Sequence, residues 1–109
     1  MSHGVTEKIA DQREFFAEQA LDAEALGRLS AETTERMKAT GVVRLLQPPE
    51  HGGYAADPTD FIEAVMALAS ADPAVGWVAG VIGVHPWEMA FNDQQVLKEI
   101  WRQDADTWV

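Results

Sequence analysis

The residues best suited to chemistry in this sequence are Trp77 and His85, which lie in its most apolar stretch, residues 72–92. An indole presents a large, flat apolar face, and a neutral imidazole can both donate and accept a hydrogen bond. Together the two side chains could hold a flat ring and exchange a hydrogen bond or a proton with a polar group on it.

The spacing of these two residues predicts that they share one face of a helix. They are eight residues apart, which at 3.6 residues per turn leaves them within about 80° of each other. Gly80 lies between them, and Gly76 and Gly83 stand one turn to either side. Because each interior glycine costs a helix about 1 kcal/mol relative to alanine, three of them indicate that a backbone or a flat ligand approaches closely.

A purely structural interpretation of the same residues must be weighed against the chemical one. A tryptophan in an apolar helix is usually a core residue, and a lone histidine beside a proline more often makes a structural hydrogen bond. The residue types alone leave both interpretations open.

Two Asp-Pro pairs mark where helices begin. Asp72 can cap a helix whose first position, Pro73, lacks an N–H that would be unpaired anyway, and Asp57 and Pro58 repeat the arrangement. Further along the first of these helices, Pro86 removes one backbone hydrogen bond and predicts a bend.

The remaining apolar periodicity predicts a small all-α bundle. Ser30 caps a polar surface helix, and a glycine ends it in the left-handed conformation. The expected elements are a helix from Thr6 to about Glu24, a helix from Ser30 to Gly41, a buried extended connector over 42–46, a turn over 50–54, a buried helix from Asp57, the central helix from Asp72, and a last helix capped by Asn92 or Asp93.

Composition restricts the classes of protein and of partner. The 109 residues are 47% hydrophobic, enough for one small domain with a modest core. Eight basic and 18 acidic residues give a net charge of −10, which argues against nucleic acid or an anionic membrane as a partner. No cysteine, no signal peptide and no apolar run long enough to span a bilayer are present, so we expect a cytoplasmic protein.

No metal or phosphate site is expected. His3, His51 and His85 are far apart and form no ligand pair on one helix face. We expect His3 to be solvated in a frayed tail and His51 to be an incidental residue of an exposed loop. The neighbouring Gly52-Gly53 pair lacks the third glycine and the strand-to-helix context of a dinucleotide-binding loop.

Two segments resemble a known family. Residues 76–87, GWVAGVIGVHPW, look like the corresponding helix of flavin-dependent aromatic monooxygenases that have the acyl-CoA dehydrogenase fold. Among these, the oxygenase components that hydroxylate a phenolic secosteroid in steroid degradation are most similar, and those of 4-hydroxyphenylacetate hydroxylases are further off. Residues 40–53, TGVVRLLQPPEHGG, are similar to the Pro-Glu-x-Gly-Gly signature in the amino-terminal helical domain of that superfamily.

The resemblance implies a domain organisation. Residues 1–104 would be the amino-terminal α-helical domain, like that of acyl-CoA dehydrogenases. Residues 105–109 would begin the first strand of a β-barrel domain that lies outside this sequence. The chain would then be one domain of a longer protein and inactive alone.

The resemblance also implies an activity. Such oxygenases take reduced flavin, FMN or FAD, from a separate flavin reductase and use O2 to hydroxylate a phenolic substrate, generally as homotetramers. Trp77 matches a tryptophan that lines the flavin and substrate pocket, and His85 matches a catalytic histidine near the phenol. Gly80, between them, would form the floor that the substrate contacts.

Two alternatives remain at this stage. One is the amino-terminal domain of an acyl-CoA dehydrogenase, which has the same fold but has less use for an imidazole in this helix. The other is a non-enzymatic helical interaction module. A free-standing module should have no large exposed apolar patch, whereas a domain separated from its neighbours should expose one.

Overall fold

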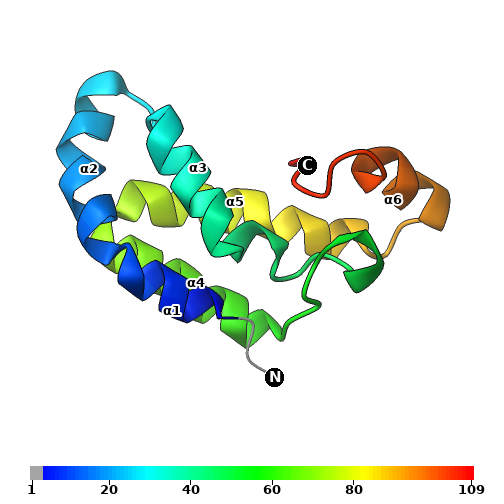
Figure 1. The fold of residues 1–109 in the computed structure, drawn as a ribbon. Helices are drawn as coiled ribbons and strands as arrows, with labels where there is room; N and C mark the ends of the chain where they lie inside the picture. Colours follow the sequence, from blue (N-terminus) through cyan, green and yellow to red (C-terminus); the bar gives the residue numbers. More distant parts are fainter. Residues whose placement is uncertain (1–3) are drawn as a thin grey trace.

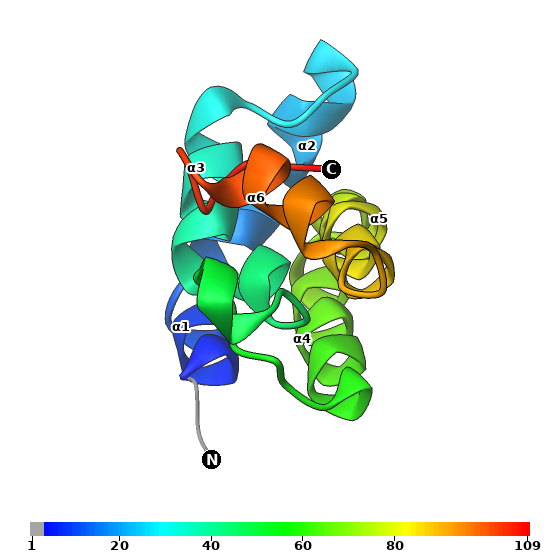
Figure 2. The same ribbon diagram turned by 90° about the vertical axis from the view of Figure 1, so that its right-hand side faces the viewer.

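The computed structural model describes residues 4–109, which fold into a helical bundle (Figure 1). Helices α4 and α5 lie side by side, α1 and α2 pack against α4, and the turn η1 packs against α5 (Figure 2). The elements are α1 (Val5–Asp11), α2 (Arg13–Leu26), α3 (Ala31–Thr40), the 3-10 turns η1 (Val42–Arg44) and η2 (Pro49–His51), α4 (Pro58–Ala71), α5 (Pro73–Met89) and α6 (Gln94–Trp101). The predicted all-α class is confirmed.

Side-chain caps begin α3, α4, α5 and α6 at predicted positions, whereas α1 and α2 begin without one. Asp57 Oδ1 accepts a hydrogen bond from the Thr59 N–H at 2.8 Å, and this bond lowers the pKa of the Asp57 carboxyl. Asp72 Oδ1 accepts from the Ala74 N–H at 3.0 Å, and Ser30 caps α3 in the same way. Of the two candidates for the last helix, Asp93 is the cap, since its Oδ1 accepts from the Gln95 N–H.

The single helix predicted from Thr6 to Glu24 is wrong, because the chain turns between α1 and α2. Gln12 leaves the helical conformation with φ −109° and ψ 9°. On either side of this break, Ile9 and Phe16 both reach the core and are almost fully buried. No glycine or proline marks the turn, so local sequence gives no sign of it.

The extended connector predicted over 42–46 is also wrong in conformation, although it is buried as expected. Val42–Arg44 form a 3-10 turn, and Leu45 keeps helical angles, φ −55° and ψ −45°. Within it the Arg44 N–H donates to the carbonyl of Gly41 at 3.0 Å. A compact turn satisfies its own backbone groups, whereas an extended segment here would bury them without a partner strand.

The bundle has one apolar core, to which α1 to α5 and the segment after α3 contribute. Its fully buried members come from every part of this region, including α3, which is less superficial than its polar composition predicts. The largest are Phe16, Ile9, Met37, Leu45 and Leu68.

Two glycines of α5 allow it to approach α4 closely. A Cβ atom on Gly76 would lie 2.7 Å from the Cα of Ala69, and one on Gly83 would lie 2.5 Å from Cε1 of Phe61. Neither distance is tolerable, so the α4–α5 contact requires glycine at both positions. Pro86 does not end the helix, which continues to Met89.

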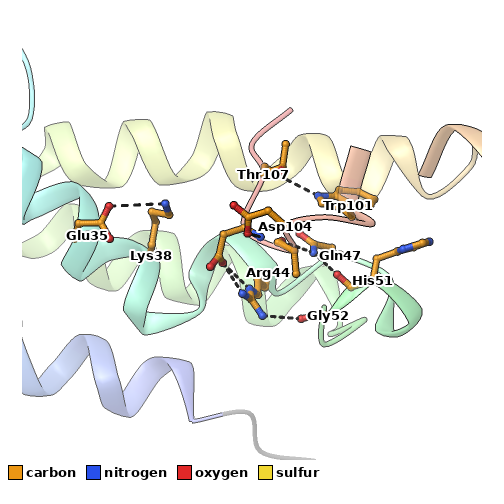
Figure 3. A network of polar contacts seen from close by, with 11 residues as sticks. Glu35, Lys38, Arg44, Gln47, His51, Gly52, Trp101, Asp104 and Thr107 are labelled. Atoms are coloured by element: carbon orange, nitrogen blue, oxygen red, sulfur yellow. Dashed lines mark hydrogen bonds and ion pairs between the residues drawn. The ribbon is translucent and has the colours of Figure 1, made fainter. Parts of the chain in front are cut away.

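The last residues fold back onto the η1–η2 region through a set of polar contacts (Figure 3). Buried Gln47 donates through Nε2 to the carbonyls of His51 at 2.7 Å and Ala105 at 2.8 Å. Arg44 donates to Asp106 at 2.8 Å, and Trp101 Nε1 donates to the carbonyl of Thr107 at 3.1 Å. We call these contacts the C-terminal clasp.

None of the helices within residues 4–109 combines the length and hydropathy needed to cross a membrane.

Candidate functional site

Trp77 and His85 line one open groove on the outer side of the α4–α5 pair, as their spacing predicts. The groove has a volume of about 570 Å³, and its walls are apolar apart from the imidazole and the indole N–H. We call it the α4–α5 groove. It is lined by Val65 and Ala69 of α4 and by Pro73, Gly76, Trp77, Gly80, Val81, Val84 and His85 of α5.

Trp77 is not a core residue. Its side chain is 74% exposed, in contrast to the buried Val75 and Gly76 beside it. Leaving an indole in water forfeits the burial of a large apolar area, and packing within this domain does not explain its position. The structural interpretation of Trp77 as core therefore fails.

His85 is held by a neighbour on the same helix. Its Nδ1 lies 2.9 Å from Oε1 of Glu88, one turn further along α5, and both side chains are partly exposed. No hydrogen bond to Nε2 is found within residues 4–109, so that nitrogen remains open to a ligand.

Gly80 differs from the two glycines that the α4–α5 contact requires. A Cβ atom placed on it would lie 3.6 Å from Cγ1 of Val65, which is an ordinary van der Waals distance. Packing within the domain would therefore accept alanine here. What the missing side chain provides is depth in the floor of the groove between the indole and the imidazole.

A second apolar cavity, of about 590 Å³, lies between α2 and the start of α5. Leu21 of α2, which is 77% exposed, lines it, and Trp77 lines both cavities. Apolar surface therefore continues past the indole on both sides.

His51 lies elsewhere. The sequence suggested an exposed loop residue, and this expectation is wrong. Its ring is 5.7 Å from that of Trp101, and its Nε2 is buried with no partner in the described chain. The adjacent glycines serve packing: a Cβ on Gly53 would lie 1.9 Å from the carbonyl oxygen of Gln47. This region belongs to the C-terminal clasp.

No cluster of three or more histidine, aspartate or glutamate side chains suited to a metal ion is found over residues 4–109. His3 falls outside the described residues. Three residues at the site were missed from the sequence. Val65 and Ala69 come from another helix and left no local signal, whereas Glu88, the partner of His85, could have been found from its spacing of three residues from that histidine.

Comparison with known proteins gives relatives over the whole length of the chain. No family model matches. The chain is 46% identical to the pigment production hydroxylase of Rhodococcus erythropolis over 100% of its own length and 28% of the relative. It is 43% identical to the oxygenase subunit HsaA of a flavin-dependent monooxygenase from Rhodococcus jostii, over 82% of this chain and 23% of the relative.

A solved structure agrees with these matches. The crystal structure of 3-HSA hydroxylase from Rhodococcus sp. RHA1 superposes with a TM-score of 0.94 at 38% identity, covering 98% of this chain and 28% of the other. The chain thus spans only 23% to 28% of the length of these hydroxylases. None of the relatives named here is an acyl-CoA dehydrogenase.

Proposed function

Because the chain is homologous to the amino-terminal part of the oxygenase components of flavin-dependent monooxygenases, we propose that it is the helical domain of a two-component enzyme that hydroxylates a phenol. The observation that supports this most is that an indole, an open glycine floor and an imidazole share one groove. Residues 1–104 form the domain, and residues 105–109 lead toward a β-barrel domain.

The chemistry of the groove fits an aromatic ring with one polar group. Trp77 offers a face for stacking, and Gly80 leaves room for the edge of a ring. His85 is the one ionisable side chain among the lining residues, so it is placed to exchange a hydrogen bond with a phenolic hydroxyl. Reduced flavin, FMN or FAD, would activate O2 beside the bound phenol.

The groove needs a second wall before it can exclude water. It is open to solvent, and water exclusion is a main contribution of protein to oxygenation. That wall would come from the remainder of the polypeptide. Ile62 and Met66, exposed by 56% and 64% on α4, extend the apolar surface that such a wall would cover.

This exposed surface also weighs against a free-standing interaction module. The full assignment is a cytoplasmic homotetramer that receives reduced flavin from a separate reductase and acts on a phenol with a bulky, fused apolar body. The extent of apolar surface on both sides of Trp77 supports a substrate larger than a single ring.

The direct test is His85→Ala in the polypeptide that carries the complete enzyme. Loss of the hydrogen bond to the phenol should slow hydroxylation by roughly 10²-fold or more, and more of the consumed O2 should leave as hydrogen peroxide. Product and peroxide are measured together. As a matched control, Glu63→Ala changes an exposed residue of α4 and should leave both yields unchanged. Normal product and peroxide yields in His85→Ala would remove His85 from the mechanism.

A further inference from the structure

The contact between His85 and Glu88 determines which ring nitrogen a ligand can use. Nδ1 of His85 and Oε1 of Glu88 are 2.9 Å apart, the distance of a well-formed hydrogen bond. An ionised carboxylate only accepts hydrogen bonds. Nδ1 is therefore the donor and carries the hydrogen in this pair.

The position of that hydrogen fixes the character of the other nitrogen. In a neutral imidazole with the hydrogen on Nδ1, Nε2 has a free lone pair and can only accept. Without a partner on Nδ1, the hydrogen can move to Nε2, and the same atom becomes a donor. A groove with an Nε2 acceptor favours a ligand that presents a hydroxyl hydrogen, whereas a donor there favours a carbonyl or a phenolate.

We propose that Glu88 is a positioning residue: it holds the hydrogen of His85 on Nδ1, so that Nε2 accepts the hydroxyl hydrogen of a neutral phenol in the α4–α5 groove. This deepens the proposed function, since it concerns the ligand of that same groove. Glu88 is not among the lining residues and acts only through the imidazole.

A weak surface contact is sufficient for this role. Glu88 is 63% exposed and His85 45% exposed, so the pair adds little to the stability of the fold. The two neutral tautomers of imidazole are close in free energy, and a small bias selects between them. Among residues 4–109, His85 is the one ionisable side chain that lines the groove, and Glu88 is the one hydrogen-bond partner found for its imidazole.

The hydrogen can be located directly by NMR on the 109-residue chain. Long-range ¹H–¹⁵N correlations distinguish the protonated from the unprotonated nitrogen of each imidazole, above the pH at which the rings become neutral. Loss of one set of signals in His85→Gln assigns His85 against His3 and His51. Glu88→Ala and the isosteric Glu88→Gln are compared with Glu63→Ala, which removes an exposed carboxylate from α4.

The proposal predicts that His85 of the native chain carries its hydrogen mainly on Nδ1. In Glu88→Ala the ratio of the two tautomers should shift toward Nε2–H by about twofold or more, as loss of a helical side-chain pair would give. Glu88→Gln should shift the ratio in the same direction but by less, because an amide can either accept from Nδ1–H or donate to Nδ1. Glu63→Ala should leave the ratio unchanged.

Native His85 with its hydrogen on Nε2, or a ratio that Glu88→Ala does not change, would overturn the proposal. This readout needs neither flavin nor substrate. A failure of the proposal is therefore distinguishable from a failure of the hydroxylase assignment, which the assay of His85→Ala decides.

Discussion

Glycines on one face of helix α5 serve different purposes. Gly76 and Gly83 are required where α5 packs against α4, because a Cβ atom would collide with Ala69 or Phe61. Gly80, between them on the same face, has room for a Cβ, and Trp77, which lines the groove with it, stands largely in solvent. The packed positions are shaped for the stability of the fold. The groove positions, Gly80 and Trp77, forgo stability that alanine at one and burial at the other would provide, which indicates that they are shaped for something outside this domain.

The largest effect should come from disrupting a packed position. Gly76→Ala places a methyl group against backbone atoms of Ala69, which cannot move aside as a flexible side chain would. We expect a loss of about 2 kcal/mol in the free energy of unfolding, measured by chemical denaturation of the 109-residue chain. A gain in stability would show that the α4–α5 contact is looser than described.

Gly80→Ala should have the opposite sign. The new methyl group meets only an ordinary contact with Val65, and alanine favours a helix over glycine by about 1 kcal/mol. Denaturation should therefore show a stabilised chain, while hydroxylation by the complete enzyme should fall because the groove floor is raised. Destabilisation like that of Gly76→Ala would show that the two glycine positions are equivalent.

The smallest effect on stability is expected from Trp77→Ala. Removing a large aromatic side chain from a core costs about 3–5 kcal/mol, but a mostly exposed one should change the free energy of unfolding by less than about 0.5 kcal/mol. The same measurement on Phe16→Ala, which truncates a fully buried side chain, gives the loss of stability expected for a core residue. A loss of unfolding free energy near that of Phe16→Ala would show that Trp77 is a core residue after all.

The regions of the molecule also differ in how far sequence could predict them. The caps at Asp57 and Asp72 and the shared face of Trp77 and His85 follow from local rules and from the helical period, so they were predicted. Helix-compatible sequence also surrounds Gln12, where the chain turns to bury both Ile9 and Phe16. Such a break depends on packing between distant segments and leaves no local signal.

The candidate site shows the same division. The residues contributed by α5 could be predicted, whereas the wall formed by Val65 could not, because it depends on how α4 lies against α5. The 42–46 segment was predicted as buried from its composition, but the 3-10 turn at Val42–Arg44 follows from the absence of a partner strand among residues 4–109. Composition thus predicted burial, and tertiary packing decided conformation.

The most direct test is a crystal structure of the complete polypeptide with flavin and a bulky phenol bound. We predict a ring of the flavin or the phenol in van der Waals contact with Trp77 and Gly80, and a phenolic oxygen within hydrogen-bond distance of Nε2 of His85. An α4–α5 groove filled by side chains from the rest of the protein, with both ligands bound elsewhere, would contradict the account.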